Sequence, residues 1–213
     1  NVYFTGIVRG LQGRKMSKTL GNSPDPRKLN DEFGADGVRV GMLLTAPAGN
    51  DLPFDPALCE QGRNFSNKIW NALRLLKGWE TDSQLQQSES SKLGVQWFDA
   101  RFNEALINIE KHFNQYRISD ALMATYKLIW DDFCSWYLEI VKPPYQQPID
   151  TETHEAAVVF FEKLMKMLHP FMPFITEEIW HLLRERKEGE DIIVSIMPRA
   201  AKPDNKIISA FEK

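Results

Sequence analysis

A short basic segment near the amino end carries the residues best suited to chemistry. Lys15, Ser17, Lys18 and Thr19 place two ammonium groups and two hydroxyls within five residues. Each ammonium is a compact charge with three hydrogen-bond donors, and each hydroxyl adds one more donor. Such a set could wrap the oxygens of a triphosphate. On composition alone, a solvated charged turn explains these residues equally well.

The surrounding sequence favours an anionic ligand. Residues 9–28 contain six Lys or Arg but a single acidic residue, Asp25, in a chain whose formal net charge is −3. A local excess of positive charge attracts polyanions. Gly13 and Gly21 flank the segment and allow its backbone to change angles and swing. The segment is not a Walker loop, because GxxxxGK[ST] cannot be placed in it.

The composition is typical of a globular protein. Of the 213 residues, 43% are hydrophobic and 26% are charged, which excludes a disordered acidic tail, a collagen-like fibre and a small disulfide scaffold. Cys59 and Cys134 form no CxxC motif and the four histidines are dispersed, so we expect reduced thiols, a cytoplasmic location and no metal site. No apolar run reaches the roughly 18 residues of a membrane span. Because the sequence begins without Met, we also expect a fragment of a longer chain.

Hydrophobic periodicity predicts the elements that must position this segment. We expect a strand at 2–8, a polar connector at 80–94, an N-cap at Ser119 and an extended piece at 192–194. The predicted helices cover residues 26–34, 35–45, 57–79, 95–116, 120–142, 152–168 and 173–187, with a further element at 203–213. Aromatic residues at helical spacing are expected in the core, namely Phe98, Phe102, Phe113, Phe133 and Trp136. The predicted fold class is therefore mainly α, an antiparallel helix bundle over 53–213 preceded by a short α/β piece over 1–52.

The predicted helix 57–79 has a polar stripe opposite its apolar stripe. At roughly 100° per residue, the apolar side gathers Leu58, Gly62, Phe65, Ile69, Ala72, Leu73 and Leu76. The polar side gathers Arg63, Asn67, Trp70, Asn71 and Arg74, with Lys68 at its margin. Aromatic, Arg and amide groups of this kind read single-stranded RNA loops. The residues alone favour a simpler interpretation, in which the Trp packs under a neighbouring helix and the charges are solvated.

Several segments resemble a known family. Residues 13–22, GRKMSKTLGN, resemble the KMSKS signature of class I aminoacyl-tRNA synthetases, with Thr19 retaining a hydroxyl in place of the last Ser. The likeness continues through NSPDP at 22–26 and GADGVR at 34–39. Further segments are similar to the valyl-tRNA synthetase family in particular, at residues 46–51, 60–65, 130–139 and 168–180.

This resemblance implies an ATP-dependent ligase that activates valine and transfers it to tRNA(Val), with Mg²⁺ accompanying the ATP. It implies that Lys15 and Lys18 are catalytic and that Lys15, Met16, Ser17, Lys18 and Thr19 bind ATP. Residues 1–52 would be the end of a Rossmann catalytic domain. The bundle would bind the anticodon stem-loop, which favours RNA contact by Arg63, Asn67, Lys68, Trp70, Asn71 and Arg74.

The resemblance also implies a monomeric, cytoplasmic enzyme without a membrane anchor. No HIGH-type sequence occurs in the chain, so we expect the fragment to be inactive alone. Two alternatives from the same family are an isoleucyl or a leucyl enzyme. Alternatives of a different class are a non-catalytic helical RNA-binding module and a purely structural bundle.

Overall fold

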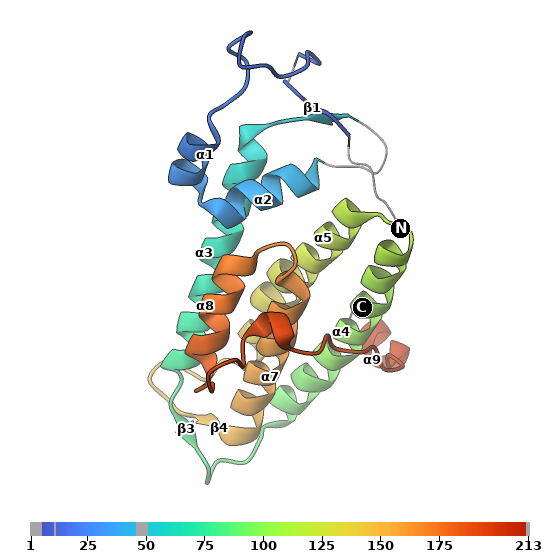
Figure 1. The fold of residues 1–213 in the computed structure, drawn as a ribbon. Helices are drawn as coiled ribbons and strands as arrows, with labels where there is room; N and C mark the ends of the chain where they lie inside the picture. Colours follow the sequence, from blue (N-terminus) through green and yellow to red (C-terminus); the bar gives the residue numbers. More distant parts are fainter. Residues whose placement is uncertain (1–5, 11, 46–50, 212–213) are drawn as a thin grey trace.

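The computed structural model describes residues 6–10, 12–45 and 51–211. The basic loop lies at one end of the molecule and the helix bundle extends from it, as Figure 1 shows. The helices are α1 (Pro26–Phe33), α2 (Ala35–Leu44), α3 (Pro56–Gly78), α4 (Glu89–Asn114), α5 (Ile118–Lys127), α6 (Leu138–Val141), α7 (Thr151–Leu168), α8 (Pro173–Leu183) and α9 (Asn205–Phe211). A π-helix, η1 (Leu128–Tyr137), joins α5 to α6, and η2 (Ile192–Val194) is a 3₁₀-helix.

One short parallel strand pair lies at each end of the molecule. At the loop end, β1 (Val8–Arg9) pairs with β2 (Leu52–Pro53). At the opposite end, β3 (Thr81–Asp82) pairs with β4 (Ile149–Asp150). The predicted strand at 2–8 lies partly outside the described residues. Within the described part of the chain, no helix is both long and apolar enough to cross a membrane.

Local capping explains where α1 and α3 begin. Pro26 and Pro56 occupy the first turns, where a missing N–H costs nothing. The carboxylates of Asp25 and Asp55 accept hydrogen bonds from backbone N–H groups two residues further on, at 2.9 Å in both helices. The helices predicted over 26–34, 35–45 and 57–79 are therefore confirmed to within a residue or two.

An aromatic cluster fills the bundle core. The rings of Phe133 and Phe161 stack with centroids 5.5 Å apart and an angle of 2°, while Phe98 lies 5.3 Å from Phe133. The core prediction is confirmed for Phe98, Phe102 and Phe133, which are buried. Phe113 is half-buried and stacks on Phe171 at 5.9 Å.

The core prediction for Trp136 is wrong, because 61% of this residue is exposed. The cause is η1, whose π-helical turn takes more residues than an α-helical turn. Ile129, Phe133 and Tyr137 consequently face the core at steps of four, and Tyr137 takes the place predicted for Trp136. An α-helical period cannot anticipate this rotation.

Several predicted boundaries are also wrong. Helix α4 begins at Glu89, where the Ser88 hydroxyl accepts a hydrogen bond from the N–H of Ser91 at 3.0 Å, so the polar connector 80–94 is partly helical. Ser119 lies inside α5 and is not its N-cap, and 192–194 forms a 3₁₀-helix where an extended piece was expected. Helix α8 stops at Leu183, short of 187, because the chain turns to pair Arg184 with Glu162 of α7 at 3.1 Å.

Candidate functional site

The first half of the basic loop is a tight turn that requires glycine. The N–H of Gly13 donates to the carbonyl of Gly10 at 2.8 Å, and Gly13 has a φ of 75°, which side chains disfavour. Arg9 braces the turn from β1, because its guanidinium donates to the Gly13 carbonyl and to Asp51. This hydrogen bond lowers the pKa of Asp51 below its usual value.

Asn22 organises the second half of the loop. Its side-chain oxygen accepts from the N–H of Ser17 at 2.8 Å, and its amide nitrogen donates to the carbonyl of Lys15 at 3.2 Å. The Ser17 hydroxyl in turn accepts from the N–H of Thr19 at 3.2 Å. Residues 12–22, hereafter the signature loop, therefore have a defined shape set by side-chain bonds to the backbone.

The signature loop is anchored by Met16. This residue packs against a small apolar cluster made by Phe33 of α1, Cys59 of α3 and Phe54, which lies just before α3. Ser17 is half-buried beside it, whereas Lys15, Lys18 and Thr19 are exposed. The anchor thus separates residues that hold the loop from residues that face outward.

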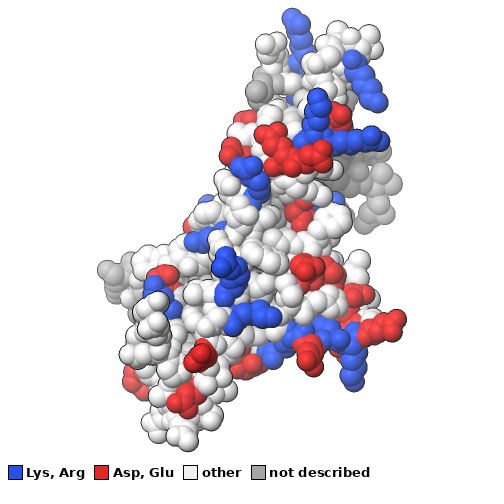
Figure 2. Space-filling model, turned by 90° about the vertical axis from the view of Figure 1, so that its left-hand side faces the viewer, with Lys and Arg blue, Asp and Glu red and all other residues white. Residues whose placement is uncertain are grey.

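The two predicted catalytic lysines are available to a ligand. The ion pairs formed within residues 6–10, 12–45 and 51–211 include neither Lys15 nor Lys18. Basic side chains project at the top of the molecule in Figure 2, with acidic groups gathered just below them. A pocket of about 530 Å³ opens beside the loop and is lined by Gly10, Gln12, Arg14, Met16, Leu20, Gly21, Asn22, Ser23, Pro24, Phe54 and Pro56.

Most of the polar stripe of α3 is exposed, including Trp70, which the simpler interpretation placed under a neighbouring helix, whereas Arg63 and Lys68 are half-buried. Asn67, Trp70, Asn71 and Arg74 are exposed, and Trp70 retains 36% of its surface. The predicted apolar side is buried except for Leu58, which is half-buried, while Cys59 is buried beside it. The exposed residues of the polar stripe therefore face away from the bundle core.

Two of the predicted RNA-contacting cations have partners within the chain. Arg63 pairs with Glu60 at 3.1 Å and lies 5.7 Å over the ring of Phe33. The Lys68 ammonium lies 5.4 Å over the ring of Trp130. Arg74 is the exposed cation of the stripe, and it lies nearest the far end of α3.

Sequence reasoning missed a second feature at that far end. A pocket of about 600 Å³ lies between the end of α3 and the loop that follows α6, and Tyr145 at its rim is 90% exposed. Its lining residues are Leu75, Gly78, Trp79, Glu80, Lys142, Pro143, Pro144, Tyr145, Gln146 and Gln147. An aromatic residue and two amides after a Pro-Pro break were the available signal, because exposed loop aromatics often bind ligands.

A joint between α2 and α8 connects the loop end to the bundle. The buried carboxylate of Asp36 accepts from the N–H of Ile175 at 2.7 Å. Burial raises the pKa of Asp36 above its usual value, although this hydrogen bond and the charge of Arg39 oppose the shift. Nearby, the His169 ring bonds to the Thr176 hydroxyl at 2.8 Å, and burial lowers the pKa of His169.

One group of possible metal ligands occurs among the described residues. Ligand atoms of Glu177, His181 and Asp191 all lie within 4.8 Å of one another, and the His181 ring nitrogen is 3.2 Å and 3.1 Å from the two carboxylates. These are hydrogen-bond distances, and Glu177 also accepts from the N–H of Ile192. The cluster therefore holds the segment after α8 against that helix.

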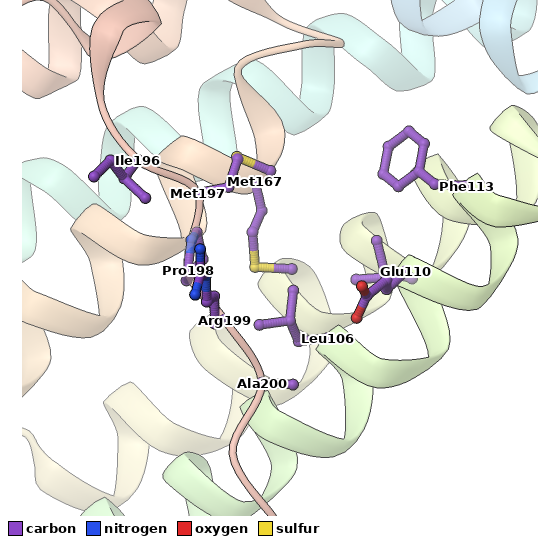
Figure 3. A pocket seen from close by; sticks show the side chains of 10 residues that line it. Leu106, Glu110, Phe113, Met167, Ile196, Met197, Pro198, Arg199 and Ala200 are labelled. Atoms are coloured by element: carbon purple, nitrogen blue, oxygen red, sulfur yellow. The ribbon is translucent and has the colours of Figure 1, made fainter.

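A further pocket is mainly apolar. Figure 3 shows the segment before α9, with Met197 and Pro198, on one side of this pocket and Leu106 and Phe113 of α4 on the other. The cavity holds about 530 Å³, and Glu110 and Arg199 supply its charged groups. Its lining contains no pairing of a nucleophile with a base, so it does not suggest a catalytic centre.

Two protein families match parts of the chain. Residues 1–55 match the family described as class I tRNA synthetases (I, L, M and V), and residues 95–213 match the anticodon-binding domain of tRNA ligase. The chain belongs to the family of anticodon-binding domains of tRNA ligase.

Several individual proteins similar to the chain are valine–tRNA ligases. The chain is 59% identical to the valine–tRNA ligase of Parabacteroides distasonis and 57% identical to that of Christiangramia forsetii. These matches cover 100% and 99% of the chain but only 24% of each relative. The valine–tRNA ligase of Chlorobaculum tepidum is 37% identical over 93% of the chain.

A solved structure shares the fold. The agnB2 LeuRS of Agrobacterium radiobacter K84, in a ternary complex with tRNA and LeuAMS, aligns with a TM-score of 0.63. The alignment covers 96% of this chain and 24% of that one, at 19% identity. The predicted fold class, a helix bundle of the anticodon-binding type after a short α/β piece, is confirmed.

Proposed function

We propose that the chain is the part of a valine–tRNA ligase that carries the signature loop and binds the anticodon stem-loop. The parent enzyme activates valine with ATP and transfers it to tRNA(Val), as a cytoplasmic monomer. The observation that supports the catalytic half is the pair of exposed lysines, Lys15 and Lys18, on a loop whose shape is set by Asn22. The chain spans about a quarter of its relatives' length. Because no HIGH-type sequence occurs in it, we expect no aminoacylation by this part alone.

The lysines act on the charge that develops during activation. The valine carboxylate attacks the α-phosphate of ATP, the bond to the β-phosphate oxygen breaks, and pyrophosphate leaves. Negative charge builds on the leaving oxygens, and preorganised cations there lower the barrier. Lys18 contacts these phosphates, Lys15 supports it, and the hydroxyls of Ser17 and Thr19 add donors. Mg²⁺ enters with ATP as part of the substrate.

Substitution of Lys18 in the full-length enzyme tests this role. Lys18→Ala should lower valine-dependent ATP–pyrophosphate exchange about 10²- to 10³-fold, the usual effect of losing one transition-state donor. Lys111→Ala, an exposed change on α4, is the matched control and should leave exchange unchanged. Near-normal exchange in the Lys18 variant would remove that lysine from the mechanism.

The bundle, with its domain boundary at residues 52–53, binds the RNA. We place the anticodon stem-loop along the exposed face of α3, past Asn67, Asn71 and Arg74, with an unstacked base at Tyr145. Arginine and amide groups suit phosphates and base edges, and an exposed aromatic ring suits stacking. Trp70 lies on the same face, while Arg63 and Lys68 reach RNA only by leaving their present partners.

Titration with RNA hairpins tests this half of the proposal. The anticodon stem-loops of valine and isoleucine tRNAs are titrated into the full-length enzyme at two salt concentrations. Binding through phosphates should weaken steeply as salt rises, and the valine hairpin should bind more tightly. Equal and salt-insensitive signals for both hairpins would contradict RNA recognition by this domain.

A further inference from the structure

Helix α8 takes its N-terminal cap from a distant part of the chain. Its own N-cap residue, Met172, makes no side-chain bond to the helix. Asp36 of α2 supplies the missing acceptor, because its carboxylate receives the N–H groups of Phe174 and Ile175 at 3.4 and 2.7 Å. A carboxylate at this position also opposes the positive end of the helix dipole. Asp36 is only 7% exposed, so this bond lies inside the joint.

Arg39, which carries the opposite charge, binds the same turn. Its guanidinium donates to the carbonyls of Pro170 and Phe171, both at 3.1 Å, just before α8 begins. Asp36 and Arg39 lie three residues apart on α2, so they share one face of that helix. Together they bind both the donors and the acceptors of the α7–α8 turn.

The other side of α2 is locked against α3. A Cβ atom on Gly62 would lie 2.6 Å from the carbonyl oxygen of Gly37, so the two backbones are in direct contact. Helix α1 leads into α2 through Gly34 and follows the signature loop in the chain. Helix α2 is therefore the element through which the loop end is attached both to α3 and to α8.

We propose that Asp36 and Arg39 are positioning residues that hold the α7–α8 turn on α2 and so set the orientation of the signature loop relative to the RNA-binding bundle. This inference rests on the proposed function, in which one tRNA must reach the active site and the bundle together. Two contacts on one ligand reinforce each other only when the geometry between them is held. A displacement of about 1 Å at the reacting end can cost about 10²-fold in rate.

The test uses full-length enzyme with Asp36→Ala, Arg39→Ala and Arg39→Lys. Three quantities are measured: valine-dependent ATP–pyrophosphate exchange without tRNA, affinity for the isolated anticodon stem-loop, and kcat/KM for aminoacylation of whole tRNA. Exchange and stem-loop affinity should stay within about twofold, while kcat/KM for whole tRNA should fall about 10- to 100-fold. Arg39→Lys keeps the charge but loses the forked donors of the guanidinium, so its kcat/KM for whole tRNA should lie between the values for wild type and Arg39→Ala. Asp31→Ala, an exposed acidic change on α1, is the matched control.

The outcomes separate this inference from the ligase proposal. Unchanged kcat/KM for whole tRNA in an enzyme that still exchanges pyrophosphate refutes the positioning role alone. A parallel fall of all three quantities shows a merely structural role and also refutes it. If Asp36→Ala lowers the melting temperature, the test is decided by the Arg39 variants, because Arg39 is exposed. Absence of exchange in the unsubstituted enzyme refutes the ligase function and the positioning role with it.

Discussion

Gly41 of α2 lies directly against Cys59 of α3. A Cβ atom on Gly41 would approach the Cys59 sulfur to 2.6 Å and the Cys59 backbone nitrogen to 2.7 Å. Cys59 itself is fully buried, so neither group can move outward. This contact joins the helix behind the signature loop to the helix that carries the polar stripe.

Gly41→Ala should therefore destabilise the protein. Inserting a methyl group into a filled contact typically costs about 1–3 kcal/mol. The control is Gly78→Ala at the end of α3, where a Cβ would meet nothing within 4 Å and Ala favours the helix. Urea denaturation of both variants measures the difference, and equal midpoints would contradict the close packing of α2 on α3.

The π-helix predicts a large loss of stability for substitution of one aromatic residue and a small one for another three positions away. Phe133→Ala removes a fully buried ring and should cost about 3–5 kcal/mol. Trp136→Ala removes a side chain that is mostly exposed, and should change the free energy of unfolding by about 0.5 kcal/mol or less. Chemical denaturation distinguishes them. A large loss of unfolding free energy for Trp136→Ala would contradict the π-helix and support the α-helical register that the sequence predicts.

The stability of the α2–α8 joint should depend on pH through His169. Burial lowers the folded-state pKa of His169, although Glu177 and Asp36 oppose the shift. The unfolded chain then binds the proton more tightly, so this contribution is fully present above about pH 6.5 and is lost as the pH falls through the lower folded-state pKa. Unfolding of wild type and His169→Gln between pH 7.5 and 5 tests this. Parallel pH profiles would exclude the effect.

Arg74 should contribute a phosphate contact. Arg74→Ala should weaken binding of different stem-loops to a similar degree and lower the slope of log affinity against log salt by about 1. Lys111→Ala on α4 serves as the control for a lost surface charge. The measurement is fluorescence titration at three salt concentrations. An unchanged slope would place the RNA away from this end of α3.

Much of the architecture could be predicted from the sequence because its signals are local. The boundaries of α1 and α3 follow from a capping Asp, a Pro in the first turn and an apolar period of 3.6 residues. The exposure of Lys15 and Lys18 follows from the charge of the glycine-flanked segment. The polar face of α3 was visible for the same reason, since helical angles depend only on positions along the chain.

Other features depend on contacts between distant residues. Asp36 caps a helix that begins 137 residues later, and neither segment alone shows that its partner exists. Tyr145 belongs to a pocket because the strand pair β3–β4 brings its loop to the end of α3. Trp136 faces outward because η1 departs from the α-helical turn.

The sequence by itself indicated most of the helices and the two exposed lysines of the signature loop. The tertiary structure decided which of the predicted cations are free and how the loop is held relative to the bundle. Arg63 and Lys68 carry the same positive charge as Arg74, but in the fold they lie over the rings of Phe33 and Trp130. The physical reason is that charge and periodicity are properties of neighbouring residues, whereas partnership is created when the chain packs.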